Sequence, residues 1–534
     1  MHKQSDDKSS MMKLISNTIK SRWHDVALSD YGTDISYTYK ELFEKITKIH
    51  ILLELNGIKP GDKIALCDKN SSNWAVTFLA LYTYKVVVVP LLADFHIQQI
   101  ESLVVHSDAK LLFTNRSIFN KASSCQEIMI DVKTLHPFVT GSALDETYSN
   151  LNDVFTSRYP DGLKTKHVHF EDENMDDLAI ISYTSGSTGN PKGVMLPNRA
   201  IWSNNLYART HFPLTHDKAC ISILPLAHMF GMAFEFIYPI SVGCHIYFLT
   251  RLPSPQIILK AFGEIKPFLI ILVPLIIEKI IQGKIFPVIR QPKIAFALKI
   301  PGVRNIIYRS IRKKLTAAFG NHFNQVIFGG AALNKEVENI LRKIKFHYTC
   351  GYGMTEFAPL IAYSDWKKYV PNSCGRIVDR MEIDILSDDP ENVPGEIICK
   401  GDNMMIGYYK NPDATAETID KAGWLHTGDL GTIDRQGNIF IKGRKKNMLL
   451  SANGQNIYPE EIEAILSQQT LIDECVVVQR EQKLVGLVYT SDETLKNQEI
   501  SRKDFESSLD DIRNVVNEML PKYSQLSHLE LHDE

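Results

Sequence analysis

The stretch Tyr183-Thr-Ser-Gly-Ser-Thr-Gly-Asn-Pro-Lys-Gly193 is the most informative part of the sequence, because it places hydroxyls, glycines and a lysine directly after the apolar run Leu178–Ser182. Phosphate needs many short donors at close range, and glycines let the backbone approach it. Lys192 adds a mobile positive charge of the kind that follows a β- or γ-phosphate. The residues predicted to surround a polyphosphate are Thr184, Ser185, Gly186, Ser187, Thr188 and Gly189. We therefore expect a strand that ends in a phosphate-binding loop.

This loop differs from the P-loop of kinases and GTPases. That motif requires Gly-Lys-Ser/Thr at the start of a helix, whereas here Pro191 precedes Lys192 and Gly193 follows it. The difference disfavours a P-loop enzyme. The alternative for the stretch by itself is an ordinary polar loop.

Length and composition predict a multidomain globular protein. The chain has 534 residues, and 44% of them are hydrophobic, so at least two domains are expected. Lys plus Arg (59) nearly balances Asp plus Glu (62), which argues against a nucleic-acid partner. The eight cysteines are scattered, without metal spacing or a disulfide framework. This pattern is typical of a reducing compartment.

The N-terminal segment predicts neither secretion nor import, since it contains acidic residues and has no apolar core. We therefore expect a cytoplasmic protein. The most apolar stretch, Phe268–Ile277, is too short to span a membrane and contains Pro274. It is interpreted as a buried strand that runs into a helix.

Apolar runs alternate with helical patterns along the first part of the chain, which predicts βαβ units and parallel-rich sheets of an α/β protein. Expected strands include 63–67, 86–90 and 110–114, with helical stretches at 74–81 and 97–106 between them. Short strands near 395–401 and 432–441 indicate a small β-rich subdomain. About ninety residues of compact α/β sequence follow Gly443.

The phosphate loop resembles the signature of the adenylate-forming superfamily, which contains acyl-CoA synthetases, peptide-synthetase adenylation domains and luciferases. Further signatures of this family follow in the family's order: Leu224-Pro-Leu-Ala-His-Met-Phe-Gly-Met232, Gly329-Gly-Ala-Ala-Leu333, Gly351-Tyr-Gly-Met-Thr-Glu356, Gly395-Glu396, Gly423-Trp-Leu-His-Thr-Gly-Asp429, Gly443-Arg-Lys-Lys446 and Asn453-Gly-Gln-Asn-Ile-Tyr-Pro-Glu-Glu-Ile-Glu463. The resemblance runs from about Tyr37 to the end of the chain.

The resemblance implies a large N-terminal domain, residues 1–443, and a small mobile α+β lid, residues 444–534, that rotates between two half-reactions. It implies ATP, Mg²⁺ and CoA as co-substrates and cofactors. A cation must offset the repulsion when a carboxylate attacks a phosphate, and Glu356 is the implied Mg²⁺ ligand. Implied catalytic residues are Lys192, His228, Thr355 and Glu356.

The resemblance also assigns residues to the nucleotide. Tyr352 would stack on adenine beside Met354, Gly353 would let the acyl group pass, and Thr355 would bond the α-phosphate. The small residues Gly330, Ala331 and Ala332 would form a flat wall for adenine and the acyl head, although such residues are often mere packing.

The C-terminal motifs imply further roles. Asp429 would hold the ribose with help from Arg444, Lys446 occupies the hinge position, and Gly454 would line the pantetheine tunnel. The glutamates at 460, 461 and 463 are interpreted as a solvated helix face and partners of the helix dipole.

His228 is interpreted as a residue that positions the acid. A carboxylate is already ionised at neutral pH and needs no general base. A satisfied core histidine is the alternative for such a side chain among apolar neighbours.

The stretch 265–281 carries no charged anchor for an amino acid and resembles the corresponding part of long-chain fatty acyl-CoA synthetases. A medium- or long-chain fatty acid is therefore the expected substrate, and CoA the expected acceptor. An acyl carrier protein is the alternative acceptor. The basic and apolar stretch Lys284–Arg312 would contact a membrane or such a carrier, unless it is only a surface helix.

One expected feature is missing from the pattern. The family carries near its C-terminus a lysine that contacts carboxylate and α-phosphate, and the chain stops at Leu529–Glu534 before that segment; Lys522 lies too early to replace it. Slow adenylation is the corresponding expectation. A binding protein for nucleotide or acyl-adenylate without turnover is the third interpretation.

Overall fold

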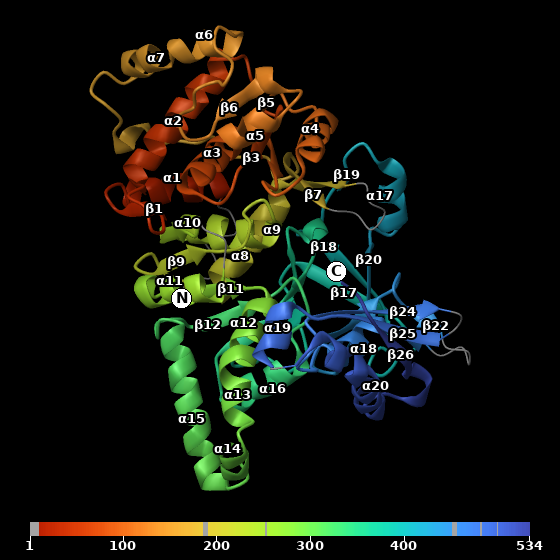
Figure 1. Cartoon of the computed structure of the whole chain (residues 1–534). Helices are drawn as coiled ribbons and strands as arrows, with labels where there is room; N and C mark the ends of the chain where they lie inside the picture. Colours follow the sequence, from red (N-terminus) through yellow and green to blue (C-terminus); the bar gives the residue numbers. More distant parts are fainter. Residues whose placement is uncertain are drawn as a thin grey trace.

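The structure is a computed structural model, and it describes residues 10–184, 191–250, 254–450, 456–480, 483–498 and 500–533. Figure 1 shows the first half of the chain, in red to green, as layered sheets and helices, with the blue C-terminal part beside α12 and α16. The architecture is mixed α/β, as the alternating sequence pattern predicted.

The first large sheet carries the phosphate loop. Its central strands β3, β4, β5, β6 and β7 run parallel, whereas β8 and β19 add antiparallel strands at one edge. The order across the sheet is β19 (Gly407–Tyr408), β8 (Lys192–Pro197), β7 (Leu178–Thr184), β4 (Val87–Leu91), β3 (Lys63–Cys67), β5 (Leu111–Thr114) and β6 (Met129–Asp131). The strands expected at 63–67, 86–90 and 110–114 are confirmed.

The second large sheet is parallel except for its last strand, β2. Its order is β13 (Tyr348–Cys350), β12 (Gln325–Phe328), β11 (Leu269–Leu272), β9 (Ala219–Ser222), β10 (His245–Phe248), β1 (Val26–Asp30) and β2 (Ser36–Thr38). The apolar stretch 268–277 forms β11 and the start of α12 (Pro274–Ile280), as predicted.

Helices cover these sheets and separate them. They are α1 (Met11–Ser21), α2 (Tyr39–Leu55), α3 (Ser72–Thr83), α4 (Ile97–His106), α5 (Arg116–Lys121), α6 (Ala143–Ser149), α7 (Leu151–Arg158), α8 (Asn198–His211), α9 (Met229–Gly231), α10 (Tyr238–Val242), α11 (Pro255–Ile265) and α16 (Lys335–Lys343). Every residue of α3 is buried, which explains its nearly continuous apolar sequence.

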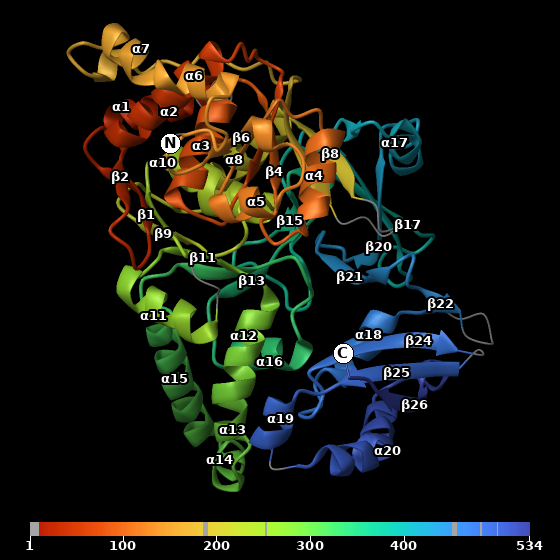
Figure 2. The ribbon, with the colours of Figure 1, turned by 45° about the horizontal axis from the view of Figure 1, so that its top comes forward.

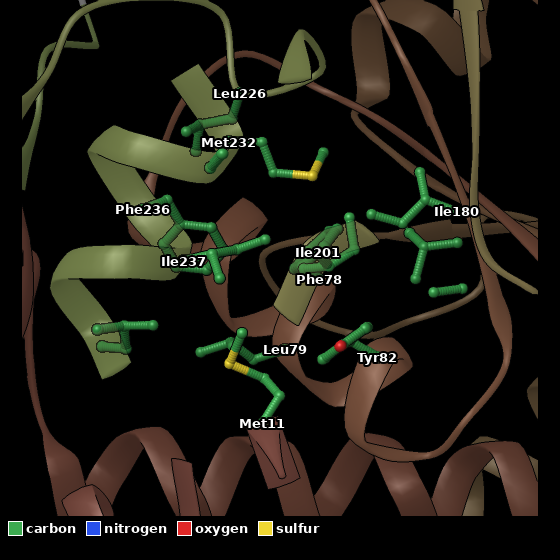
Figure 3. Close-up of a cluster of buried hydrophobic side chains, with 14 of the residues drawn as sticks. Met11, Phe78, Leu79, Tyr82, Ile180, Ile201, Leu226, Met232, Phe236 and Ile237 are labelled. Carbon is green, nitrogen blue, oxygen red and sulfur yellow. The ribbon is translucent and has the colours of Figure 1, made fainter. Parts of the chain in front are cut away.

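A hydrophobic cluster fixes the strand that leads into the phosphate loop. Figure 3 shows Ile180 of β7 near Ile201 of α8 and Phe78 of α3. The ring of Phe78 lies 5.7 Å from that of Phe236, which belongs to the π-helix Met232–Ile237. Burial of such large side chains stabilises the fold by about 2 kcal/mol each. The loop therefore starts from a rigid strand.

Two smaller antiparallel sheets form the β-rich part expected near Gly395. One contains β17 (Met381–Leu386), β18 (Gly395–Gly401), β20 (Leu425–Ile433) and β21 (Ile439–Arg444), and the other β14 (Tyr352–Gly353), β15 (Leu360–Tyr363) and β16 (Arg376–Ile377). Helix α17 (Pro412–Thr418) precedes β20.

The C-terminal part is a small α+β unit with its own hydrophobic core, which includes Ile462, Phe505 and Leu529. Its elements are β22 (Leu449–Leu450), β23 (Asn456–Ile457), α18 (Pro459–Leu466), β24 (Glu474–Arg480), β25 (Lys483–Tyr489), α19 (Asp492–Asn497), α20 (Arg502–Glu518) and β26 (Leu526–Leu531). Strands β24, β25 and β26 form one sheet.

A helical hairpin projects from the second sheet, at the lower end of the molecule in Figure 1. It consists of α13 (Phe286–Ile289), α14 (Pro292–Ala297) and α15 (Pro301–Ala318). Across the described residues, no helix is long and apolar enough to cross a membrane. All eight cysteines are free thiols in the structure.

Candidate active site

The phosphate loop closes a β-hairpin. Strands β7 and β8 are antiparallel, and the Cα of Thr184 lies opposite that of Lys192. The loop thus leads into a strand, whereas a P-loop leads into a helix, in agreement with the sequence argument. The predicted donors Ser185, Gly186, Ser187, Thr188 and Gly189 lie outside the described residues, so their approach to phosphate stays a prediction.

Lys192 and Glu356 both contact Tyr408, a residue that sequence reasoning missed. Nζ of Lys192 lies 4.7 Å from the ring centroid of Tyr408, a cation–π contact. The hydroxyl of Tyr408 donates a hydrogen bond of 2.8 Å to Oε1 of Glu356. Tyr408 reaches this position because β19 pairs with β8. Burial raises the pKa of its phenol, so the hydroxyl stays protonated and can donate.

Glu356 is positioned by a short 3₁₀ turn, Thr355–Phe357, and is buried. Its carbonyl oxygen accepts a 2.8 Å hydrogen bond from the backbone N–H of Met405. Its Oε2 has no hydrogen-bond partner within the described ranges. Mg²⁺ is commonly held by one or two carboxylates together with substrate phosphates, so this donor set fits Mg²⁺. Among the described residues, no group of three or more His, Cys, Asp or Glu side chains could hold a metal ion.

Asp429 and Arg444 form the opposite end of the site. They are directly opposed across β20 and β21, and Arg444 Nε lies 2.7 Å from Asp429 Oδ1. The hydroxyl of Tyr352 donates to Asp429 Oδ2 at 2.5 Å. Burial raises the pKa of Asp429, and the charge of Arg444 opposes that shift. The three predicted nucleotide residues are therefore brought together.

Two cavities meet at Tyr352 and the glycines around it. A cavity of about 740 Å³ lies between the β-rich part and the C-terminal unit, and its walls include Ala331, Ala332, Asp429 and Arg444. A second cavity of about 360 Å³ lies between the second large sheet, at β11 and β12, and the small sheet of β14 and β15. Both cavities are lined by Gly330, Gly351, Tyr352 and Gly353.

The smaller cavity has an apolar lining. Its walls include Phe212, Met229, Phe230, Phe234, Ile271, Val273, Ile327 and Tyr363, and the predicted residues His228, Met354 and Thr355 also line it. No Asp, Glu, Lys or Arg is among its described lining residues. His228 precedes α9 and keeps part of its surface in contact with solvent, while the protein atoms packed around the imidazole partly desolvate it and lower its pKa from 6.5.

Gly353 has a packing reason to be glycine. A Cβ at this position would lie 2.2 Å from the carbonyl oxygen of Pro359 on the neighbouring backbone. The close approach of β14 to β15 therefore requires a glycine, whatever passes through the cavity.

An ion pair lies next to the predicted hinge residue, Lys446. Lys445 Nζ lies 2.8 Å from Oε2 of the buried Glu396, which also accepts from His426 Nδ1 at 3.2 Å. Burial opposes ionisation of Glu396, but these two partners outweigh it and lower its pKa. Lys446 follows directly after this contact. Gly454 lies outside the described residues.

The helix α18 corrects one expectation. Glu460 is half-buried, and its Oε1 accepts from Asn447 Nδ2 at 2.7 Å and from the backbone N–H of Arg444 at 3.3 Å. Glu460 and Glu461 line the larger cavity, and Glu463 accepts from the N–H of Val477 at 2.8 Å. These residues are therefore structural contacts between segments; a solvated face was the wrong interpretation, because β21 and β24 pack against α18.

Comparison with known proteins identifies the family. A family model described as AMP-binding enzyme matches residues 17–409, and one described as AMP-binding enzyme C-terminal domain matches residues 446–532. The chain belongs to the AMP-binding enzymes, the adenylate-forming superfamily that its motifs resemble. The reaction class of this family is ATP-dependent formation of an acyl adenylate, followed by ligation to CoA.

Particular relatives are distant. Long chain acyl-CoA synthetase 1 of Arabidopsis thaliana is 28% identical over 527 residues, covering 89% of this chain and 76% of that protein. 4-coumarate:CoA ligase 1 of Petunia hybrida is 29% identical over 488 residues, which cover 85% of this chain and 78% of that protein. The solved structure of o-succinylbenzoate CoA synthetase from Bacillus subtilis, in complex with its acyl-adenylate intermediate, superimposes with a TM-score of 0.74 at 20% sequence identity. The superposition covers 98% of this chain and 94% of that structure. That similarity shows the shared fold.

Proposed function

We propose that this enzyme activates a medium- or long-chain fatty acid with ATP, releases pyrophosphate, and transfers the acyl group from AMP to the thiol of CoA. The observation that carries the proposal is the common wall of the two cavities, formed by Gly330, Gly351, Tyr352 and Gly353. A nucleotide in the larger cavity and an acyl chain in the smaller one would have their reactive ends at this wall.

The nucleotide would be held from both ends. Asp429, kept in place by Arg444 and Tyr352, presents carboxylate oxygens to the ribose hydroxyls. Gly330, Ala331 and Ala332 leave a flat surface for the adenine, beside Met354. The loop Thr184–Gly189 and Lys192 would hold the β- and γ-phosphates.

The reacting centre would combine Thr355, Lys192 and Glu356. The Thr355 hydroxyl would donate to the α-phosphate, and Lys192 would neutralise charge on the departing pyrophosphate. Glu356 would hold Mg²⁺, which supplies positive charge that lowers repulsion between carboxylate and phosphate. The carboxylate oxygen then forms the bond to the α-phosphorus while the bond to the β-phosphate oxygen breaks.

His228 would orient the acid. Its lowered pKa keeps the imidazole neutral at pH 7, so it can donate one hydrogen bond to a carboxylate without adding charge. The acid is ionised at that pH and requires no base.

The choice of acid rests on the apolar cavity. Its lining offers no counter-charge for an ammonium group, which disfavours an amino acid. The named relatives include a long-chain acyl-CoA synthetase and a 4-coumarate:CoA ligase, so an aromatic acid is the rival to exclude.

The C-terminal unit would act as the lid. We place the domain boundary at 443/444 and the pivot at Lys446, directly after the Lys445–Glu396 contact. Rotation about Lys446 would carry the 453–463 segment, with Gly454, toward the pantetheine.

The test is acid-dependent release of pyrophosphate from MgATP, with fatty acids of increasing length and with 4-coumarate, followed by addition of CoA or a pantetheine-bearing carrier protein. We expect release with fatty acids and faster turnover with CoA. Glu356→Gln should abolish release while binding of AMP persists. Release only with 4-coumarate, or transfer only to the carrier protein, would contradict the proposal.

A further inference from the structure

The helical hairpin of α13, α14 and α15 ends in a tip, which we define as residues 293–306. Figures 1 and 2 both show this tip as the part of the hairpin farthest from the sheets. The base of the hairpin is anchored, because Phe286 of α13 and Leu315 of α15 are buried in the core beside the second sheet. The tip therefore projects on a fixed support.

The hairpin carries a one-sided charge. From Lys284 to Lys314 the sequence contains nine cations and no Asp or Glu: Lys284, Arg290, Lys293, Lys299, Arg304, Arg309, Arg312, Lys313 and Lys314. Arg290 pairs with Glu336 at 3.3 Å and also donates to Thr470 of the C-terminal unit. The other eight cations form no ion pair with any described residue. A surface of this kind attracts anions.

Large apolar side chains are exposed between these cations. The exposed fractions are 68% for Phe296, 44% for Ile300, 38% for Val303 and 67% for Ile306. Single exposed apolar residues are ordinary, but four within eleven positions of one projecting tip indicate a contact surface. Cations around exposed Phe and Ile side chains are typical of helices that lie in a membrane interface.

The base of the hairpin leads back to the acyl cavity. Ile271 of β11 and Val273 both line that cavity, and α12 continues from Val273 toward α13. One continuous segment of chain thus connects the cavity wall with the tip.

We propose that the tip docks on an anionic lipid bilayer, with Phe296 and Ile306 entering the headgroup region and the cations contacting lipid phosphates. The charge of the hairpin and its exposed apolar residues carry this inference. Docking on lipid does not depend on the proposed function. The link to that function rests on a fatty acid being the substrate, because the bilayer would then be a reservoir of substrate beside the cavity.

The test uses the whole protein and two kinds of vesicle, phosphatidylcholine alone and phosphatidylcholine mixed with phosphatidylserine. Sedimentation with vesicles needs neither ATP nor acid, so its outcome is separate from that of the activity assay. We expect binding to the mixed vesicles and weakening by salt. Lys293→Gln/Lys299→Gln/Arg304→Gln and, separately, Phe296→Ser/Ile306→Ser should each lower the partition coefficient by about tenfold or more.

The matched control is Lys121→Gln/Lys166→Gln/Lys421→Gln, which removes the same charge from exposed positions elsewhere. It should bind as the unchanged protein does, and all variants should keep the unchanged thermal midpoint. Absence of binding to the anionic vesicles, or equal loss in the control, would overturn the proposal. Unaltered vesicle binding in the tip variants, with loss of transfer to a carrier protein, would assign the tip to that protein instead.

Discussion

The hydroxyl of Tyr408 donates a 2.8 Å hydrogen bond to Oε1 of Glu356. The ring of the same tyrosine lies under Nζ of Lys192. Tyr408 thus contacts a cation through its ring and an anion through its hydroxyl. In the proposed reaction Lys192 would bind phosphate, and Glu356 would offer Mg²⁺ the oxygen that Tyr408 leaves free.

Tyr408→Phe should lower kcat/KM for acid-dependent pyrophosphate release by about tenfold, because a hydrogen bond to a charged group contributes about 1.5–3 kcal/mol. The half-saturating Mg²⁺ concentration should rise, since Glu356 loses the partner that orients it. A Mg²⁺ titration of the initial rate measures both changes. Tyr409→Phe is the control, because that hydroxyl donates at 2.6 Å to Asp108, outside the site. Equal effects of the two variants would exclude the orienting role of Tyr408.

Asp429→Asn should weaken binding of AMP by tenfold or more. The substitution removes the charge that pairs with Arg444 and an acceptor for the ribose hydroxyls. Titration calorimetry with AMP measures the loss. Glu391→Gln removes an exposed carboxylate that pairs with Arg435 and should leave AMP binding unchanged. Retained affinity in Asp429→Asn would place the ribose elsewhere.

Val273→Phe should shift the chain-length preference toward shorter acids, because Val273 lines the smaller cavity and a larger side chain fills part of its volume. We expect kcat/KM for the longest acids to fall by about tenfold, with KM for ATP unchanged. Leu275→Phe, two residues along and 56% exposed, should leave the preference as it is. A uniform loss for all acids in Val273→Phe would mean that the acyl chain lies elsewhere.

Stability should fall as the pH drops from 6.5 to about 4. Burial lowers the pKa of His50 from 6.5 to about 4, so the unfolded chain binds a proton in this range that the folded chain refuses. The free energy of unfolding is therefore lowered by about 3 kcal/mol at about pH 4. His50→Gln should flatten the pH dependence of the urea midpoint, although His245, which is shifted in the same direction, leaves part of it. His96 is exposed, so His96→Gln is the control and should leave the pH dependence of the urea midpoint unchanged. If His50→Gln also left it unchanged, the loss of stability at low pH would belong to other groups.

Local sequence was sufficient for the strands and for most motifs, because apolar runs and glycine patterns depend on neighbours in the chain. The contact of Tyr408 with Glu356 was missed, since it requires the two-residue strand β19 to pair with β8 more than 200 positions earlier. The role of Glu460 was missed for the same reason, as its partners Arg444 and Asn447 meet it only after β21 packs on α18. Pairings between distant segments leave no periodic signal in the sequence.

Gly353 has a consequence for how related genes should be interpreted. Because a side chain at this position would collide with the backbone of Pro359, a copy that had lost all chemistry would still keep the glycine in order to fold. Glu356 and Tyr408 are buried and hydrogen-bonded to each other, but Gln and Phe fill nearly the same volumes, so a copy without activity would be free to replace the pair. Among uncharacterised sequences, the retained pair is therefore the better marker of a working enzyme than the glycine beside it.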